Sequence, residues 1–587
     1  MTSENKIVCI GIDLGTTYSS IGFFSFQSNQ PELIPDEKGS THIPSHIHFN
    51  EKINDTITVG EIAKTHPEAA RTCYDSKRVI GKNYNAIDKT TLNNIYCKTK
   101  QNQNGSMVYE MKFKKDGSEI QEEILPEEVS GKILCYLKYQ LMKRLSLSDI
   151  SNAQTVICVP CTFKDEERKA TLLAARHAGF ENVLLLNEPV ASIHEFNRVI
   201  KDKRLNKTSR RININDKIVV IDFGGGTLDI ACCVCTAENR FTVKSSHGNE
   251  HFGGNEFDVV MMNYLLQVLN ENNNEVEIDD YIVSSNEMKS DDKRNQTIRK
   301  RKNNAARLKI LAEKCKRRLS TEKYIQIPMS DLTDNKNDTN EIMITREDFE
   351  NKCEENKLLK KFEDELSAAM GKCDFSFEEV NHVLLVGGSC QIPCIEKIIY
   401  NKFRKESIVT EKFFDGMESV CKGCAVVACQ RSGTDIQPEI NIDVSEVLND
   451  PIGLKVGNTF LKFFNEGDRI PTGPQTKTVR PGRPGNQSAK FEIYKCRNEY
   501  VSDSDEFIGE LLIENIPPPN YRAGQIVKSS IAKLNVTMEI DEDQILKITV
   551  EVDGDPEKTR QLEFGINNIK RDIDFEILHR HFLNFYL

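Results

Sequence analysis

The sequence predicts an α/β domain that is followed by a mostly β, sandwich-like module and a short C-terminal helix. From Ile7 to about Gln430, short β-rich runs alternate with longer helical stretches, which is typical of an α/β core with mixed sheets. A pattern of strand, Asp, glycine-containing turn and strand occurs twice in this part. From Ile452 to Phe564, nearly every segment has the pattern of a strand or a turn.

Length, charge and composition exclude several classes of protein. The 587 residues are 38% hydrophobic and 28% charged, which is typical of a globular protein of roughly three to five domain-sized units. The net charge of -11 argues against a general nucleic-acid surface, and no apolar run approaches the ~18 residues of a membrane helix. The start, MTSENK, lacks the apolar core of a signal peptide. We therefore expect a cytoplasmic protein with no nucleic-acid or membrane partner.

Two features leave alternatives open. The basic run RKRK at 299–302 is either a nuclear localisation signal or, as we favour, a solvated helix face or loop. The 18 Cys are expected to be reduced thiols. Cys421 and Cys424 form a single CxxC pair, whereas a zinc ribbon needs two pairs at suitable spacing, so buried thiols are the favoured interpretation.

The α/β domain is predicted to cover residues 1–431. The segments 153–160 and 183–189 have the pattern of buried strands, and 165–180 has that of an amphipathic helix. The segment 378–389 is predicted to be a strand that leads into a Gly-Gly turn and a helix. Two polar stretches, 201–211 and 270–309, are predicted to be exposed insertions.

After residue 431 we expect a linker at 432–451, the β module at 452–564 and a tail at 565–587. In AKFEIYKC, Ala489, Phe491 and Ile493 alternate with charged residues, so one face of this strand should be apolar. The tail has apolar residues at spacings of three and four, and we expect one short amphipathic helix there.

The two repeated segments are predicted β-hairpins. IVCIGIDLGTTYSSIGFF spans 7–24 and contains Asp13, and KIVVIDFGGGTLDIACCVC spans 217–235 and contains Asp222. Both turns are rich in glycine, and the backbone N–H groups of such turns bind phosphate oxygens. These turns are not P-loops: the sequence GxxxxGK[ST] is absent, and each turn connects two strands instead of leading into a helix.

Acidic and hydroxyl side chains accompany the two turns. Thr16, Thr17 and Thr227 add hydroxyl donors, whereas Asp13 and Asp222 would repel a phosphate unless a cation lay between them. Mg²⁺ is usually held by one or two carboxylates together with substrate phosphates. The pattern favours a magnesium nucleotide clamped between two lobes over the alternative of two ordinary hairpins.

Several further motifs carry a family resemblance. GIDLGTTYS, IDFGGGTLD and VLLVGGS resemble, in that order, the phosphate and adenosine motifs of the actin-like ATPases. NEPVAS, DSKRVIG, FGGNEFD and EKCKRRLS resemble signatures of the seventy-kilodalton heat-shock chaperones. RIPT, GNQS and MEIDEDQILKITV resemble the substrate-binding β domain of that family, so the resemblance covers about residues 6–564.

The resemblance implies roles for residues at the matching positions. Lys77 would position the attacking water, and Glu188 would hold a magnesium-bound or attacking water. Thr227 would contact phosphate, and Asp229 would lie beside potassium. The implied cofactors are ATP or ADP, Mg²⁺ and also K⁺. The residues implied to contact Mg²⁺ through water are Asp13, Asp222 and Glu188.

The nucleotide-binding residues that the resemblance implies fall into three groups. The phosphate loops comprise Gly15, Thr16, Thr17, Tyr18, Gly224, Gly225, Gly226, Gly253 and Gly254. The helix that would grip adenine and ribose contributes Glu313, Lys316, Arg317 and Ser320, with Arg317 stacking on the base. The opposite wall comprises Gly387, Gly388 and Ser389.

The sequence departs from the family pattern near the nucleotide. Gln391 replaces an arginine that would stack on adenine, Met417 replaces an aspartate, and Asn255 replaces an acidic residue. These changes imply weaker nucleotide binding. Pro160 and Arg168 match the relay between nucleotide and linker, although the linker segment INIDV is less apolar than the leucine run of the family.

The resemblance also implies partners, which are unfolded polypeptides, a J-domain co-chaperone and a nucleotide-exchange factor whose binding is altered by the basic insertion. Phe460, Val479, Ala489 and Phe491 align with a peptide cradle, although a place in the sandwich core is equally consistent. The family's helical lid is almost entirely missing from the sequence, which predicts fast peptide release.

Three functions are compatible with these patterns. The leading hypothesis is an ATP-hydrolysing chaperone with a truncated lid. The first alternative is an ATP-binding, weakly hydrolysing partner of another chaperone, of the ribosome-associated type. The second is a small-molecule kinase of the actin-like superfamily, against which the β module argues.

Overall fold

The computed structural model describes residues 8–51, 57–115, 118–202, 205, 210–271, 292–332, 339–410, 414–433, 442–448, 450–481, 486–502, 505–522, 525–527, 531–553 and 555–563. For residues 270–271, 292–302, 526 and 555–563 only the backbone is described. The predicted tail helix at 565–587, most of the stretch 201–211, and residues 272–291 of the second insertion therefore lie outside the described residues. The described remainder of that insertion belongs to two helices, 270–271 to the end of one and 292–309 to the start of the next, and Ala305 and Leu308 are buried, so this part is not an exposed insertion.

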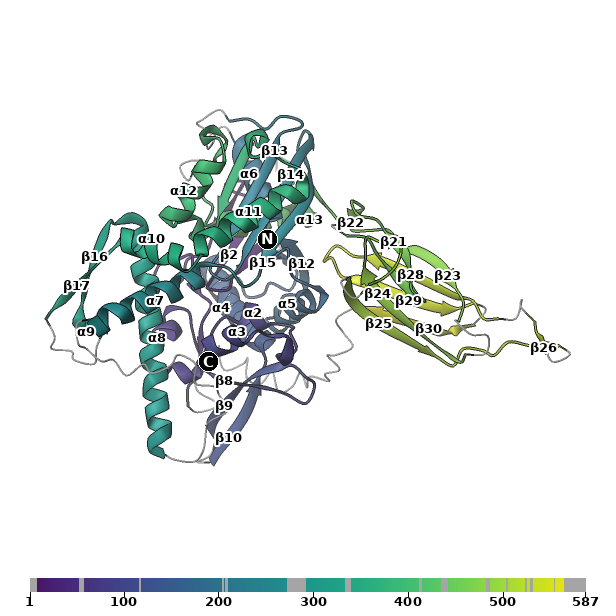
Figure 1. Ribbon diagram of the computed structural model, residues 1–587, viewed down its shortest axis with the longest axis horizontal. Coiled ribbons are helices and arrows are strands. Elements are labelled where there is room, and N and C mark those ends of the chain that lie inside the picture. The colour runs from purple at the N-terminus through teal and green to yellow at the C-terminus, as the bar shows by residue number, and fades with distance from the viewer. Residues whose placement is uncertain are drawn as a thin grey trace, which may run out of the picture.

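Two sheets of similar topology form the α/β part (Figure 1). The first has the order β12 (Asn182–Asn187), β11 (Gln154–Val159), β1 (Cys9–Leu14), β2 (Tyr18–Ser25) and β3 (Gln30–Leu33), with β4 (Ile43–Pro44) beside β2. The second has the order β18 (His382–Val386), β13 (Lys217–Phe223), β14 (Leu228–Ala237), β15 (Arg240–Asn249), β19 (Asp443–Val447) and β22 (Arg469–Ile470).

The repeated hairpins occupy equivalent places in the two sheets. β1 pairs with β2 in antiparallel fashion and with β11 in parallel fashion, and β13 pairs in the same way with β14 and β18. Asp13 and Asp222 each lie near the end of the first strand of their hairpin. The sequence repeat is therefore a structural repeat, and it brings two equivalent turns to the region between the sheets.

Helices pack on the two sheets, and each sheet with its helices forms one lobe of the α/β part. They are α1 (Glu61–Lys64), α2 (Ser76–Val79), α3 (Lys89–Asn94), α4 (Pro126–Leu145), α5 (Asp165–His177), α6 (Glu188–Lys201), α7 (Gly254–Glu271), α8 (Asp292–Thr321), α9 (Met329–Leu332), α10 (Arg346–Glu355), α11 (Leu358–Cys373), α12 (Pro393–Lys402) and α13 (Ser419–Arg431). Smaller strands are β5 (Ile47–His48), β6 (Thr58–Val59), β7 (Thr72–Cys73), β8 (Lys98–Gln101), β9 (Met107–Lys115), β10 (Ser118–Ile124), β16 (Tyr324–Pro328) and β17 (Glu341–Thr345).

Helix starts follow ordinary capping chemistry. α5 has three acidic residues in its first turn, and the side chain of Glu167 accepts a hydrogen bond from the N–H of Lys164 at 2.7 Å. α6 begins directly after β12 and has Pro189 in its first turn, where the missing N–H costs nothing. This abrupt strand-to-helix junction holds Glu188 at the start of α6.

The predicted sandwich-like module consists of two four-stranded sheets. One has the order β21 (Thr459–Phe464), β20 (Ile452–Val456), β24 (Ser488–Lys495) and β25 (Glu506–Glu514), and the other β23 (Gln475–Val479), β28 (Leu534–Ile540), β29 (Leu546–Val552) and β30 (Asp555–Glu563). A small hairpin of β26 (Tyr521–Arg522) and β27 (Gln525–Ile526) extends from it. Their inward apolar residues form a separate hydrophobic core between the sheets.

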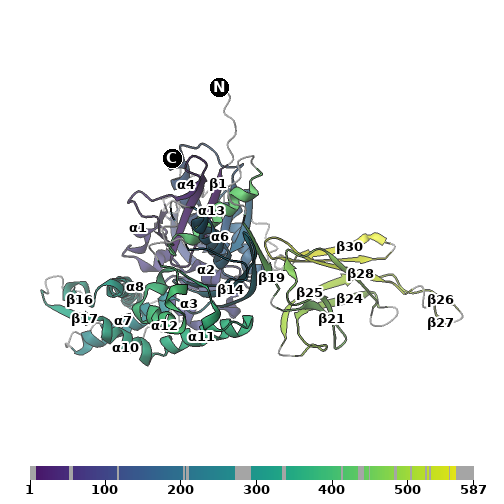
Figure 2. The same cartoon turned by 90° about the horizontal axis from the view of Figure 1, so that it is seen from above.

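A strand from the predicted linker connects the two parts. β19 extends the second α/β sheet by pairing in parallel with β15, and it pairs on its other side with β22 of the β module. Figures 1 and 2 show the β module beside the α/β part, and Figure 2 shows β19 at the junction. In the part of the chain that the structure describes, no helix is both long and apolar enough to cross a membrane.

Candidate functional site

A cavity of about 520 Å³ lies between the two lobes. The predicted site residues that line it are Asp13, Gly15, Thr16, Thr17, Tyr18, Lys77, Glu188, Asp222, Gly224, Gly225, Gly226, Thr227, Glu313, Lys316, Arg317, Ser320, Gly387, Gly388 and Ser389. Gly253, Gly254 and Asp229 do not line it. Residues separated by more than 350 positions in the sequence thus meet around one space.

The two glycine-containing turns face each other with no room for larger residues. A Cβ atom added to Gly225 would lie 2.0 Å from Oγ1 of Thr17, and one added to Gly226 would lie 2.7 Å from Oγ1 of Thr16. Gly253 packs behind the second turn, because its added Cβ would lie 2.6 Å from the carbonyl oxygen of Gly225. Gly225 and Gly226 thus lie directly against the threonine side chains of the first turn, and Gly253 lies against the backbone of the second turn, so a side chain at any of these positions would clash.

Lys77 and Glu188 form a buried ion pair at the cavity wall. Nζ of Lys77 contacts Oε1 of Glu188, and the two side chains are 8% and 9% exposed. Burial lowers the pKa of Lys77, but Glu188, Cys158 and Asp13 together outweigh this effect and hold the pKa above its usual value. Lys77 therefore stays an ammonium group, held in place by Glu188.

The second hairpin places two carboxylates directly opposite each other. Asp222 on β13 pairs with Asp229 on β14, so both side chains leave the same face of the sheet. Burial, followed by the charge of Glu188, raises the pKa of Asp222 well above its ordinary value and that of Asp229 to about 7. Like charges so close destabilise each other unless a cation compensates them.

The donor set fits a magnesium ion. Asp13, Asp222 and Glu188 are oxygen donors, as Mg²⁺ requires, and all three line the cavity. Oδ2 of Asp229 is buried and has no hydrogen-bond partner among the described residues. Its other oxygen, Oδ1, accepts from the N–H of Cys161 at 3.1 Å and from its thiol at 2.7 Å. The region thus has more buried negative charge than Lys77 alone can compensate.

The helix α8 supplies a polar wall to the cavity. Glu313 accepts hydrogen bonds from the hydroxyl of Tyr18 at 2.5 Å and from Nζ of Lys64 at 2.6 Å. Burial raises the pKa of Glu313, but the charge and hydrogen bond of Lys64, the hydrogen bond of Tyr18 and the charge of Lys316 together outweigh it and lower the pKa to about 2. Lys316 donates to the carbonyl oxygen of Gly254 at 2.9 Å, and Arg317 donates to the hydroxyl of Tyr18 at 3.0 Å. α8 therefore closes against the first hairpin.

The wall opposite α8 carries two of the three departures from the family pattern, Gln391 and Met417. Oγ of Ser389 donates to the carbonyl oxygen of Gly224 at 2.7 Å, which ties this wall to the second turn. Gln391 is exposed and lines the cavity, as does Met417. Across the cavity, Nε2 of His42 lies 3.3 Å from the carbonyl oxygen of Met417.

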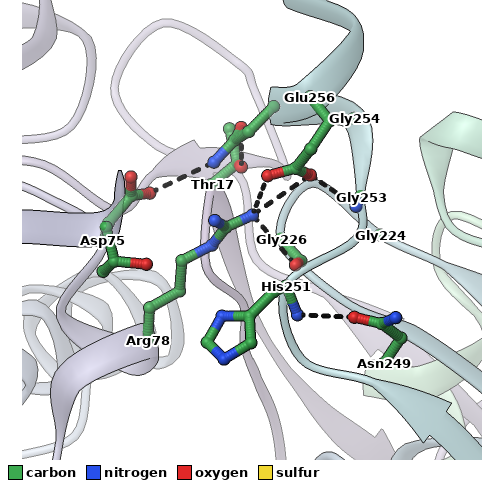
Figure 3. Close-up of polar contacts among 12 residues, drawn as sticks. Thr17, Asp75, Arg78, Gly224, Gly226, Asn249, His251, Gly253, Gly254 and Glu256 are labelled. Atoms are coloured by element: carbon green, nitrogen blue, oxygen red, sulfur yellow. Dashed lines mark hydrogen bonds and ion pairs between the residues drawn. The ribbon is translucent and has the colours of Figure 1, made fainter. Parts of the chain in front are cut away.

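Sequence reasoning missed Arg78, which follows Lys77 directly. In Figure 3 its guanidinium group points at the second turn and at the start of α7. Nη2 of Arg78 donates to the carbonyl oxygen of Gly226 at 2.9 Å and to Oε1 of Glu256 at 3.1 Å. Beside it, Nδ2 of Asn255 lies 3.4 Å from Oδ1 of Asp75. The only sequence signal was its place in the motif DSKRVIG.

The linker strand forms a polar bridge between the two parts of the chain. Glu446 on β19 accepts a hydrogen bond from Nδ2 of Asn187 at 2.5 Å and another from Nε2 of Gln544 at 2.6 Å. Asn187 immediately precedes Glu188. Nη2 of Arg168 donates to the same Asn187 at 2.7 Å, and its Nη1 donates to the carbonyl oxygen of Asp543 at 3.4 Å. A hydrogen-bond network thus connects the β module with Asn187, the residue directly before the cavity residue Glu188.

The four residues aligned with a peptide cradle are largely inside the β module. Phe460 and Phe491 are 7% and 6% exposed, and Phe491 belongs to the sandwich core. Val479 and Ala489 are partly buried and pack against that core. The core placement that the sequence left open therefore accounts for much of their apolar surface.

Comparison with known proteins places the chain in a family. The family model described as Hsp70 protein matches residues 9–574. The chain is 26% identical over 570 residues to the chloroplastic heat shock 70 kDa protein 6 of Arabidopsis thaliana, covering 96% of this chain and 70% of that protein. It is 27% identical over 548 residues to the stromal 70 kDa heat shock-related protein of Pisum sativum, with coverages of 92% and 68%.

A bacterial relative gives the same result. The chaperone protein DnaK of Prochlorococcus marinus is 26% identical over 554 residues, which cover 93% of this chain and 76% of that protein. These matches include both the α/β part and the β module. They favour neither the small-molecule kinase nor the weakly hydrolysing partner protein.

The names of the relatives correct one prediction. We expected a cytoplasmic protein, with a nuclear location as an alternative, but relatives from both Arabidopsis and Pisum are chloroplastic, so that expectation is wrong by this comparison. The prediction failed because it used only the start of the sequence and the basic run. Since the family match spans nearly the whole chain, the protein belongs to the Hsp70 family of ATP-hydrolysing, seventy-kilodalton heat-shock chaperones.

Proposed function

We propose that the cavity between the lobes binds ATP and ADP with magnesium and hydrolyses ATP through Lys77 and Glu188. The observation that carries this proposal is the buried Lys77–Glu188 pair beside two touching glycine-containing turns. The turns would bind phosphate through backbone N–H groups and through the hydroxyls of Thr16, Thr17 and Thr227. Asp13, Asp222 and Glu188 would hold Mg²⁺ through water, and Asp229 would lie beside K⁺.

The proposed hydrolysis of ATP depends on where the charged groups of Lys77 and Glu188 lie relative to the transferred phosphoryl group. Lys77 orients the attacking water and stabilises negative charge that develops on the transferred phosphoryl group. Glu188 holds the ammonium of Lys77 and a water molecule. Bound Mg²⁺ would supply further compensation of phosphate charge. Glu313, Lys316, Arg317 and Ser320 would contact adenine and ribose, opposite Gly387, Gly388 and Ser389.

The test is a single-turnover ATPase assay on the full chain, with and without a J-domain, accompanied by calorimetric titration of ADP with Mg²⁺. We expect slow hydrolysis that the J-domain accelerates. Tight ADP binding without hydrolysis under either condition would instead favour a nucleotide-holding partner protein. Absence of nucleotide binding would contradict the proposed site.

Replacement of Gln391 by arginine should tighten ADP binding. Gln391 lines the cavity on the wall opposite α8, so an arginine there would add a guanidinium group that can stack on adenine together with that of Arg317. Such a contact is worth on the order of 0.5–2 kcal/mol. Calorimetry on Gln391→Arg and on Gln391→Lys as a non-planar cationic control would measure it. An equal gain with lysine would indicate simple charge attraction, and no gain with arginine would contradict the assignment of this wall.

We further propose that residues 1–431 form the ATPase domain, 432–451 the linker and 452–564 the peptide-binding domain. Docking of the two domains would transmit the nucleotide state through the bridge of Asn187, Glu446 and Gln544. The β module would bind unfolded polypeptide near Phe460, Val479, Ala489 and Phe491. A J-domain protein and an exchange factor would act on the ATPase domain.

Domain docking should weaken as the pH rises. Oδ2 of Asp165 accepts a hydrogen bond from the N–H of Leu546 at 2.9 Å, and burial raises the pKa of Asp165 to about 6. Burial also raises the pKa of Glu446 and of Asp543. If undocking returns these carboxyls to water, the docked state binds extra protons, so docking is strongest below about pH 4 and is lost progressively as the pH rises through about 6.

Energy transfer between dyes on the two domains, measured at about pH 5 and about pH 7.5, would test this dependence. Asp165→Asn keeps an oxygen acceptor for the Leu546 N–H and should flatten the profile. Exposed Asp364, which pairs with Lys360 on α11, provides the control variant Asp364→Asn. A wild-type profile that is flat, or that rises with pH, would contradict the prediction.

A further inference from the structure

A buried thiol lies close enough to two of the proposed magnesium-binding carboxylates for one metal ion to bind all three groups. Sγ of Cys158, on β11, donates to Oδ1 of Asp13 at 3.1 Å and lies 3.8 Å from Oε1 of Glu188. The ligand atoms of these three residues all lie within 4.8 Å of one another. Among the described residues, no other group of three His, Cys, Asp or Glu side chains meets this condition.

The spacing of these atoms matches a tetrahedral zinc site. With Zn–S of about 2.3 Å and Zn–O of about 2.0–2.2 Å, tetrahedral angles put a sulfur and an oxygen ligand about 3.5 Å apart. The observed sulfur-to-oxygen distances of 3.1 and 3.8 Å lie on either side of this value. Three protein ligands leave a fourth position for water or a phosphate oxygen.

The chemistry of the three ligands also distinguishes between metals. Mg²⁺ is a hard cation that takes oxygen ligands and keeps its waters, whereas a thiolate ligand selects softer ions such as Zn²⁺. The surroundings favour a dication, because Asp222 and Asp229 add buried carboxylates while Lys77 is the one cation that contacts Glu188 in the described structure. Asp13 and Glu188 line the cavity, which provides an entry path.

We propose that Asp13, Cys158 and Glu188 form a binding site for a thiophilic divalent cation, and that the ion it takes is Zn²⁺. Binding forms a metal–sulfur bond, and the thiol proton leaves to solvent as the thiol becomes a thiolate. The bound metal replaces Lys77 as the partner of Glu188, and it occupies Asp13 and Glu188, two of the carboxylates assigned to magnesium. Zn²⁺ therefore blocks hydrolysis at this site, a consequence that rests on the proposed ATPase function, whereas metal binding itself does not.

The direct test is titration of the nucleotide-free full chain with Co²⁺, a spectroscopic substitute for Zn²⁺, followed by competition with Zn²⁺. We expect a thiolate-to-cobalt charge-transfer absorption that saturates at one metal per chain and is abolished by Zn²⁺. Cys158→Ser should remove this absorption and weaken Zn²⁺ binding by at least about 100-fold, because even loss of an outer-shell partner costs about 10- to 100-fold. The half-buried Cys135 on α4 supplies the control Cys135→Ser, which should behave as wild type.

Two further variants test whether Cys158 itself is the sulfur ligand of cobalt. Cys158→Thr replaces the thiol by a hydroxyl and a methyl group, and it should likewise lose the cobalt absorption while retaining the wild-type circular dichroism spectrum. Cys424→Ser tests the neighbouring thiol on α13. If the absorption persists in both Cys158 variants, or is lost in Cys424→Ser, the proposed ligand set is wrong.

Measuring ATP hydrolysis beside cobalt binding tests the metal site and the proposed ATPase function separately. In the wild-type chain, Zn²⁺ should inhibit single-turnover hydrolysis of magnesium ATP, and Cys158→Ser should need about 100-fold more Zn²⁺ for the same inhibition. Cobalt binding without any ATPase activity would overturn the proposed function and leave the metal site standing. ATPase activity with no cobalt–thiolate absorption would overturn the metal site alone.

Discussion

Lys77→Ala is expected to lower the rate of ATP hydrolysis by at least about 100-fold, because removal of one group that stabilises developing charge typically costs 10²–10³-fold. Binding of ADP should persist, since the predicted contacts to adenine and ribose come from α8 and the opposite wall, away from Lys77. Single-turnover hydrolysis and calorimetric titration of ADP measure the two effects separately.

Two controls define this result. Lys77→Met keeps much of the side-chain volume beside Glu188 and should be as inactive as Lys77→Ala, which excludes a cavity as the cause. Lys112→Ala removes an exposed lysine, 61% accessible, that pairs with Glu119 on the β9–β10 hairpin, and should hydrolyse ATP normally. Wild-type hydrolysis by Lys77→Met would show that Lys77 has no part in the chemistry. Joint loss of hydrolysis and ADP binding would show that it is structural.

Gly423→Ala is expected to destabilise the α/β domain by at least about 3 kcal/mol, the upper end of typical overpacking costs. Gly423 lies in α13 where that helix crosses α6, and a Cβ atom there would be 1.9 Å from the carbonyl oxygen of Ala191. The obstacle is backbone, so no rotamer change can relieve it. Because α6 begins at Glu188, the displacement should also impair hydrolysis.

The chain offers a matched control for this substitution. Gly371 also lies inside a helix, α11, but no atom comes within 4 Å of its added Cβ. Gly371→Ala should therefore stabilise the protein by about 0.5–1 kcal/mol, the ordinary helix-propensity gain. Urea unfolding followed by circular dichroism compares the two variants. Opposite changes in the free energy of unfolding are expected, and a mild effect of both would contradict the close packing of α13 on α6.

Much of the fold was predictable because it depends on local pattern. Alternating apolar residues mark β24 and the other strands of the sandwich, and the charged first turn marks the start of α5. The two hairpins repeat a strand, an aspartate and a glycine-containing turn, so the repeat alone relates Asp13 to Asp222. The roles of Lys77 and Glu188 came from family resemblance, since neither residue has a periodic signal of its own.

The tertiary structure decided the contacts between distant segments. Arg78 reaches the carbonyl of Gly226 across 148 positions, and Glu446 meets Asn187 across 259. Both contacts depend on how whole lobes pack, which no spacing rule encodes.

What the sequence by itself determined is the set of local elements and the chemical kind of the site, because periodicity, turn residues and capping act over a few neighbouring residues. Only the tertiary structure decided that Cys158 faces Asp13, that Asp229 is buried without lining the cavity, and that β19 joins the second sheet. The physical reason is that such contacts are fixed by burial of whole apolar faces, whose partners lie hundreds of residues apart.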